Sequence, residues 1–106
     1  MKQFVMVYLG GEQPTDPMEA NKHMDSYMQW LASLGEQVVV PMIPLKDTTT
    51  VRSTGEVKEG GSSYMSGFTI LKANTLQDAI LVAQTCPFLE IGGTLEVSEM
   101  MQMPVQ

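Results

Sequence analysis

Several features are scarce in this sequence, and each scarcity excludes a class of protein or site. One cysteine, Cys86, rules out an internal disulfide, and one cysteine with one histidine, His23, cannot make the usual structural zinc site. We therefore predict no metal. Six basic residues against twelve acidic ones give a net charge of -6, the wrong sign for binding a phosphate backbone or an anionic membrane. We expect neither nucleic acid nor a membrane as a partner.

Long hydrophobic runs and cofactor motifs are scarce as well. The N-terminal apolar stretch is too short for a signal peptide or a membrane span, so we expect a cytoplasmic protein. The glycine-rich stretch 59–63 is followed neither by a Lys-Ser/Thr pair nor by a helix, which favours an ordinary surface loop over a phosphate-binding loop. We predict no cofactor. With 106 residues, 43% of them hydrophobic, the chain is expected to form one globular domain, 1–106.

The clearest pattern that is present is a strand at residues 3–9, closed by Gly10-Gly11. Side chains alternate along a strand, so one face carries Phe4, Met6 and Tyr8 and the other carries Val5, Val7 and Leu9. Neither face is polar. Such a strand belongs in the middle of a sheet that is covered on both sides.

A helix is predicted over residues 17–34. Asp16 suits the N-cap, Pro17 the first helical position, Glu19 the second half of a capping box, and Gly35 the end. Steps of about 100° per residue predict the following buried face: Ala20, Met24, Tyr27, Met28, Leu31 and Leu34, with His23 and Trp30 along one edge.

The remaining elements complete a known plan. Strands are predicted at 37–43, 65–72 and 94–98, a polar edge hairpin turns at Thr54-Gly55, and a second helix runs over 75–85 before Pro87. This order predicts a ferredoxin-like βαββαβ fold of the α+β class, an antiparallel sheet with both helices on one face. The other face would expose a large apolar patch, so we predict a homodimer formed through it.

Short motifs along nearly the whole chain carry a family resemblance. They are Met1-Lys2 with its strand, the His23 helix ending in Leu34-Gly35, Thr49-Thr50-Val51-Arg52, Gly67-Phe68, and Cys86-Pro87 before Gly92-Gly93. In order and spacing they resemble YCII-related proteins, of the DGPF group in the dimeric α+β barrel superfamily. Glu59-Gly60-Gly61-Ser62 replaces the Asp-Gly-Pro-Phe signature, so the chain looks like a divergent member.

The resemblance implies a fold similar to muconolactone isomerase and to a chlorohydroxyhydroquinone dehydrochlorinase. In the YCII type, a histidine on the first helix and an aspartate before the proline after the second helix are proposed as a catalytic pair. His23 matches the histidine, whereas Cys86 stands at the aspartate position. One implied function is cofactor-independent proton transfer, of the isomerase, lyase or dehydrohalogenase type, on a small cyclic or aromatic compound, with His23 as acid or base.

The missing aspartate favours a different function, a non-catalytic dimeric module that binds a small molecule or assists another protein. The sequence leaves open whether the chain is an enzyme. Antiparallel helices would bring His23 near residues 86–90, where Glu90 or Asp16 could supply a carboxylate. Three aromatic side chains could line a substrate pocket there: Tyr8, Tyr27 and Trp30.

Each candidate also has a structural explanation. His23 could be a boundary histidine that only makes a hydrogen bond. Capping accounts for Asp16, and core packing accounts for the aromatic residues. Cys86 follows a helix C-terminus, which disfavours a thiolate, so we predict that it is a packing residue.

Overall fold

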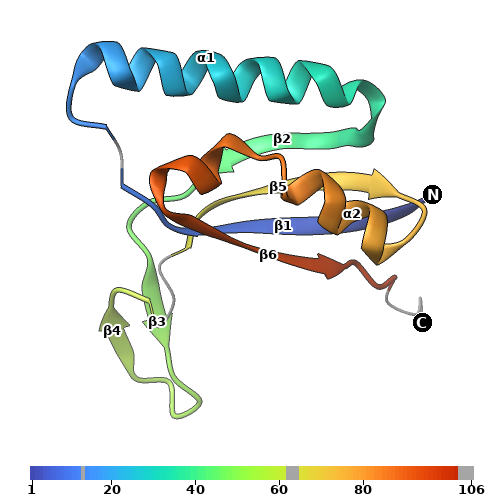
Figure 1. Ribbon diagram of the computed structural model, residues 1–106. Helices are drawn as coiled ribbons and strands as arrows, with labels where there is room; N and C mark the ends of the chain where they lie inside the picture. The colour runs from blue at the N-terminus through green and yellow to red at the C-terminus, as the bar shows by residue number, and fades with distance from the viewer. Residues whose placement is uncertain (13, 62–64, 103–106) are drawn as a thin grey trace.

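An antiparallel four-stranded sheet, in the order β2-β5-β1-β6, carries both long helices on one face in the computed structural model (Figure 1). The structure describes residues 1–12, 14–61 and 65–102. The sheet consists of β1 (Lys2–Gly10), β2 (Val38–Pro44), β5 (Met65–Ala73) and β6 (Gly93–Glu99), and the helices are α1 (Pro17–Leu34) and α2 (Leu76–Ala83). The predicted ferredoxin-like α+β fold is confirmed.

Strand β1 is the central strand that its two apolar faces predict. It pairs antiparallel with β5 on one side and with β6 on the other. The face beneath the helices carries Phe4, Met6 and Tyr8, each fully buried. The helix-free face carries Val5, Val7 and Leu9, each half-buried.

The helix-free face is apolar on three strands and polar on the fourth. Two rows of cross-strand neighbours show the pattern: Ile43, Phe68, Val7 and Glu96 in one row, and Val40, Ile70, Val5 and Ser98 in the next. Directly opposed residues share a face of the sheet. We refer to the six apolar residues of these rows as the open-face patch; it covers β2, β5 and β1 and ends at β6.

Helix α1 has the predicted ends, but its buried face differs from the prediction. The Asp16 carboxylate accepts a hydrogen bond from the Met18 N–H at 3.0 Å, and Gly35 at the other end has a φ of 54°. Met24 and Met28 are 58% and 57% exposed, whereas Trp30 is buried. The prediction for these methionines is wrong because aromatic side chains of α1 make specific inward contacts, described below, which fix the rotation of the helix.

A short 3₁₀-helix, η2 (Pro87–Ile91), follows α2 and was not predicted. The Thr75 hydroxyl caps α2 by accepting from the Asp78 N–H at 3.1 Å, as expected. Pro87 does end the helical region of α2, but it also occupies the first position of η2, which suits its fixed φ. Helix η2 packs against both α1 and β6. Another short 3₁₀-helix, η1 (Gly35–Gln37), joins α1 to β2.

The polar hairpin is present, with strands β3 (Thr49–Val51) and β4 (Val57–Glu59). It forms a separate two-stranded sheet, so its prediction as an edge of the main sheet is wrong. Figure 1 shows it projecting on the side of the sheet opposite the helices. The predicted glycine-rich loop runs partly outside the described residues. Among the described helices, none is long and apolar enough to cross a membrane.

Candidate functional site

Three hydroxyl groups meet beneath α1, and we call Tyr8, Tyr27 and Thr69 the hydroxyl cluster. Tyr8 lies on β1, Tyr27 lies on α1, and Thr69 lies on β5, where it is paired with Met6 and so sits diagonally across from Tyr8. The Tyr8 hydroxyl shares hydrogen bonds with the Tyr27 hydroxyl and with Thr69 Oγ1, the latter at 2.8 Å. The Tyr27 and Thr69 oxygens lie 3.5 Å apart. The three hydroxyl groups, which are removed from water on this face of the sheet, thus find hydrogen-bond partners in one another.

Both phenols in the cluster are held in the neutral form. Burial raises the pKa of Tyr8 far above its usual value, and the hydrogen bond with Thr69 only partly opposes that shift. Burial likewise raises the pKa of Tyr27. Neutral phenols can donate hydrogen bonds but do not act as bases near neutral pH. The cluster therefore offers donors, not a general base.

The Phe88 ring occupies the space beside this cluster. Its centroid lies 5.0 Å from that of Tyr8 at an interplanar angle of 77°, an edge-to-face contact. Two glycines make room for it: a Cβ on Gly93 would lie 2.1 Å from Phe88, and one on Gly11 would lie 2.9 Å from it. Gly11 also has a φ of +84°, which disfavours any other residue. The space between β1 and η2 is thus filled by the protein itself.

Trp30 has a structural contact that explains its burial. Its indole Nε1–H donates to Thr85 Oγ1 at 2.8 Å, and the Thr85 hydroxyl donates to the Val82 carbonyl at 2.7 Å. This chain of hydrogen bonds ties α1 to the C-terminal end of α2. The Trp30 and Tyr27 rings lie 5.6 Å apart, so the two side chains anchor the same face of α1.

Cys86, at the position of the aspartate in the resemblance, is a buried free thiol. Burial raises the pKa of this thiol to about 11, and hydrogen bonds with the Phe88 backbone and the Tyr8 hydroxyl oppose that shift only in part. The thiol is therefore protonated near neutral pH and is a poor nucleophile. This environment is the one expected for a packing cysteine.

His23 lies on α1 one turn before Tyr27, and its side chain is half-buried. In the described part of the chain, no hydrogen bond or ion pair joins it to a carboxylate. Asp16 is exposed and caps α1, while Glu90 is exposed on η2. Side chains four residues apart on a helix are neighbours, so His23 and Tyr27 form one local unit.

The predicted site residues thus fall into two groups. Tyr8, Tyr27 and Trp30 come together beneath α1, with His23 on the same helix face, whereas Asp16 and Glu90 lie on the surface. Sequence reasoning missed Thr69 and Phe88. The signal for Thr69 was present, because a lone threonine alternates with Gly67 and Leu71 on the inner face of β5. No group of three or more possible metal ligands occurs within residues 1–12, 14–61 and 65–102.

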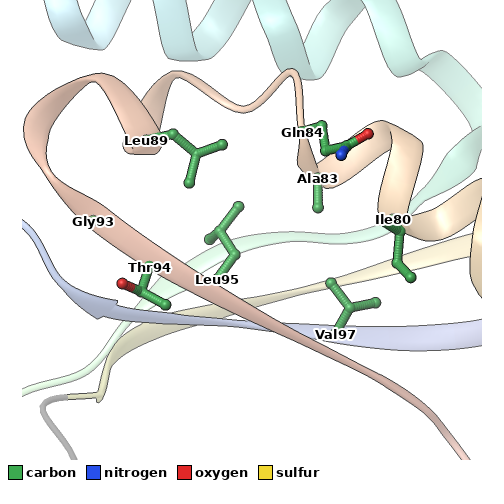
Figure 2. A pocket seen from close by; sticks show the side chains of 8 residues that line it. All are labelled: Ile80, Ala83, Gln84, Leu89, Gly93, Thr94, Leu95 and Val97. Atoms are coloured by element: carbon green, nitrogen blue, oxygen red, sulfur yellow. The ribbon is translucent and has the colours of Figure 1, made fainter.

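A groove lies on the other side of η2, between α2, η2 and β6 (Figure 2). Its volume is about 490 Å³, and its lining consists of Ile80, Ala83, Gln84, Leu89, Gly93, Thr94, Leu95 and Val97. Most of these side chains are apolar. None of the six residues predicted for the site lines it. No sequence pattern indicates the groove, because three separate elements form it.

Comparisons with known proteins support the fold. No family model and no curated protein sequence matches the chain. A solved structure, that of 5-chloro-2-hydroxyhydroquinone dehydrochlorinase from Burkholderia phenoliruptrix AC1100 in complex with 2,5-dihydroxybenzoquinone, is similar with a TM-score of 0.58. The two sequences are 14% identical, and the match covers 94% of this chain and 95% of that one. The chain therefore shares its fold with a dehydrochlorinase.

Proposed function

We propose that the chain is a divergent YCII-related protein that moves a proton on a small cyclic or aromatic compound, without a cofactor, with His23 as acid or base. The position of His23 carries this proposal. It is an ionisable side chain that is half-buried and stands one helical turn from a phenol donor. Histidine suits proton transfer near neutral pH, and partial burial with access to solvent lets it exchange its proton.

The fold shared with a dehydrochlorinase supports the choice of substrate class. That enzyme's structure holds 2,5-dihydroxybenzoquinone, a flat ring carrying several oxygens. In this chain, Tyr27 is the nearest phenol along α1 to His23, and a neutral phenol can donate to an oxygen of such a ring. Asp16 and Glu90 are the exposed carboxylates that we propose to orient the imidazole when a substrate is bound.

We further propose that two copies form a homodimer by packing their open-face patches together. The patch is continuous over three strands and has no helix above it. At about 25 cal/mol per Å², roughly 1,000 Å² of apolar burial gives a gross ~25 kcal/mol, which exceeds typical association costs. The projecting hairpin lies on the same side and would flank the second copy.

A second function is favoured by one specific observation. Cys86 is buried and protonated at the position where the resemblance places the acid, and Phe88 fills the neighbouring space. A protein that kept the fold and lost the pair would bind a small molecule without changing it. This function predicts ligand binding that is independent of His23 chemistry.

One experiment separates the two functions. The protein is incubated with 5-chloro-2-hydroxyhydroquinone, and chloride release is followed, with 2,5-dihydroxybenzoquinone binding measured in parallel by its visible absorbance. Under the enzymatic proposal, His23→Ala and His23→Asn should each lower turnover on the order of a hundred- to ten-thousand-fold while the protein stays folded. His23→Gln is the control for hydrogen bonding alone. Binding without turnover would support the module, and normal turnover by all three variants would exclude His23 as the catalyst.

A further inference from the structure

We propose that the groove between α2, η2 and β6 is a second binding site, which takes a small, uncharged ring compound. Its volume of about 490 Å³ falls in the range of pockets that enclose small organic ligands. Figure 2 shows its side chains converging from three elements. Leu95 and Val97 of β6 form one wall, Ile80 and Ala83 of α2 form the second, and Leu89 of η2 forms the third.

The polar groups in this groove are few and can give a ligand its orientation. Gln84 and Thr94 are the lining residues that have polar side chains. Thr94 is paired with Leu9, so its side chain points to the helix-free face, and Gln84 is the one that can orient a ligand. Gln84 is exposed, and among the described residues its amide makes no hydrogen bond within the protein. A primary amide offers two donors and an acceptor, so it can pair with one hydroxyl or carbonyl on a ring. An apolar lining with one such group is typical of a ligand site.

The charges around the groove select against anions. None of the lining residues is basic. One exposed carboxylate stands close by in the chain, because Glu90 directly follows Leu89. The chain as a whole carries a net charge of -6. An anionic ring would be repelled, whereas an uncharged ring of the same shape would lose only its hydration.

The groove is separate from the His23 region because η2 stands between them. Phe88 is buried and packs on Tyr8, while the next residue, Leu89, is 40% exposed and lines the groove. Ala83 contacts both the core and the groove: it packs in the core cluster that includes Tyr8, and it also forms part of a groove wall. A ligand in the groove would therefore hold α2 and η2 against β6 without needing His23.

The test uses 2-naphthol, with 2-naphthoate as its charged counterpart, titrated into the full chain and followed by backbone amide chemical shifts. We expect the shifts to concentrate in residues 80–84, 89 and 93–97, and 2-naphthoate to bind at least about tenfold more weakly. No shifts at up to about 1 mM 2-naphthol would overturn the proposal.

A matched pair of variants then locates the ligand. Leu89→Asp places a carboxylate in the wall and should weaken 2-naphthol binding by at least about tenfold. Leu81→Asp makes the same change at another exposed leucine, one outside the groove, and should leave binding unchanged. Gln84→Leu keeps the size of the side chain and should weaken 2-naphthol several-fold by removing the amide.

Three outcomes would overturn the assignment. Equal loss in Leu81→Asp would place the ligand on the outer face of α2. Loss in His23→Asn, with Leu89→Asp unaffected, would place it beside α1. Dissociation of a dimer by Leu89→Asp would make the groove an interface between copies. Loss of turnover in the His23 variants tests the proposed reaction. It does not affect the test of 2-naphthol binding in the groove.

Discussion

The two faces of the central sheet differ although they are built from alternate residues of the same strands. Beneath the helices, Met6 and Tyr8 are fully buried, and the Tyr8 hydroxyl is hydrogen-bonded to Tyr27 and Thr69. On the other face, Val5 and Val7 are only half-buried and no helix covers them. The first face is fully covered by the helices of the same chain. The second has the composition of a core but lacks a second layer, which is the physical basis for proposing a dimer.

The largest effect is expected from Val7→Lys, in the centre of the open-face patch. A lysine there would bury charge between two sheets and should convert the dimer to a monomer. Glu96 lies directly across on β6, so the new ammonium group has a partner and the monomer should stay folded. Sedimentation velocity at micromolar concentration, together with circular dichroism, measures both properties. A monomeric parent protein under the same conditions would contradict the dimer.

A smaller effect is expected from Met6→Ala, the adjacent residue on the covered face. Removing a fully buried methionine should lower the free energy of unfolding by about 2–5 kcal/mol, because the helices above it cannot close the cavity completely. Urea denaturation measures this change. Val7→Ala is the control on the other face, and at protein concentrations low enough to keep the chain monomeric it should lower the free energy of unfolding by less. Equal losses at the two positions would mean that the faces do not differ as described.

The smallest effect is a pH dependence from Cys86. Its pKa rises from 9.0 to about 11 on folding, so between these values the native state holds a proton that the unfolded chain has released. Stability is therefore fully present below about pH 9 and falls as pH rises toward 11. The buried tyrosines shift in the same direction and add to this loss. Unfolding of Cys86→Ala should depend less steeply on pH in this window, and an unchanged slope would contradict the assignment.

Much of the fold could be predicted because its signals are local. Asp16-Pro17 and Gly35 mark the ends of α1, and Thr75 marks the start of α2, through contacts that span a few residues. The double-sided composition of β1 likewise reveals its central position. By contrast, η2 was missed because a proline such as Pro87 can either end a helix or begin one, and the sequence pattern is compatible with both.

The candidate site was less predictable because it depends on distant contacts. Apolar periodicity placed Met24 on the buried face of α1, but the bonds of Tyr27 to Tyr8 and of Trp30 to Thr85 set a different rotation. Those bonds join residues that periodicity cannot relate. The groove could not be predicted for the same reason. Its walls come from three elements, and their spacing depends on how η2 packs.

The position of β1 also bears on how the chain is made. Strand β1 leaves the ribosome before both its neighbours, β5 and β6, which come much later in the sequence. Met6, for example, pairs with Thr69 and Val97. Until those segments are synthesised, a strand that is apolar on both faces has no partner in its own chain. Its folding thus depends on late, long-range pairing, and until then the strand is open to association with other nascent chains.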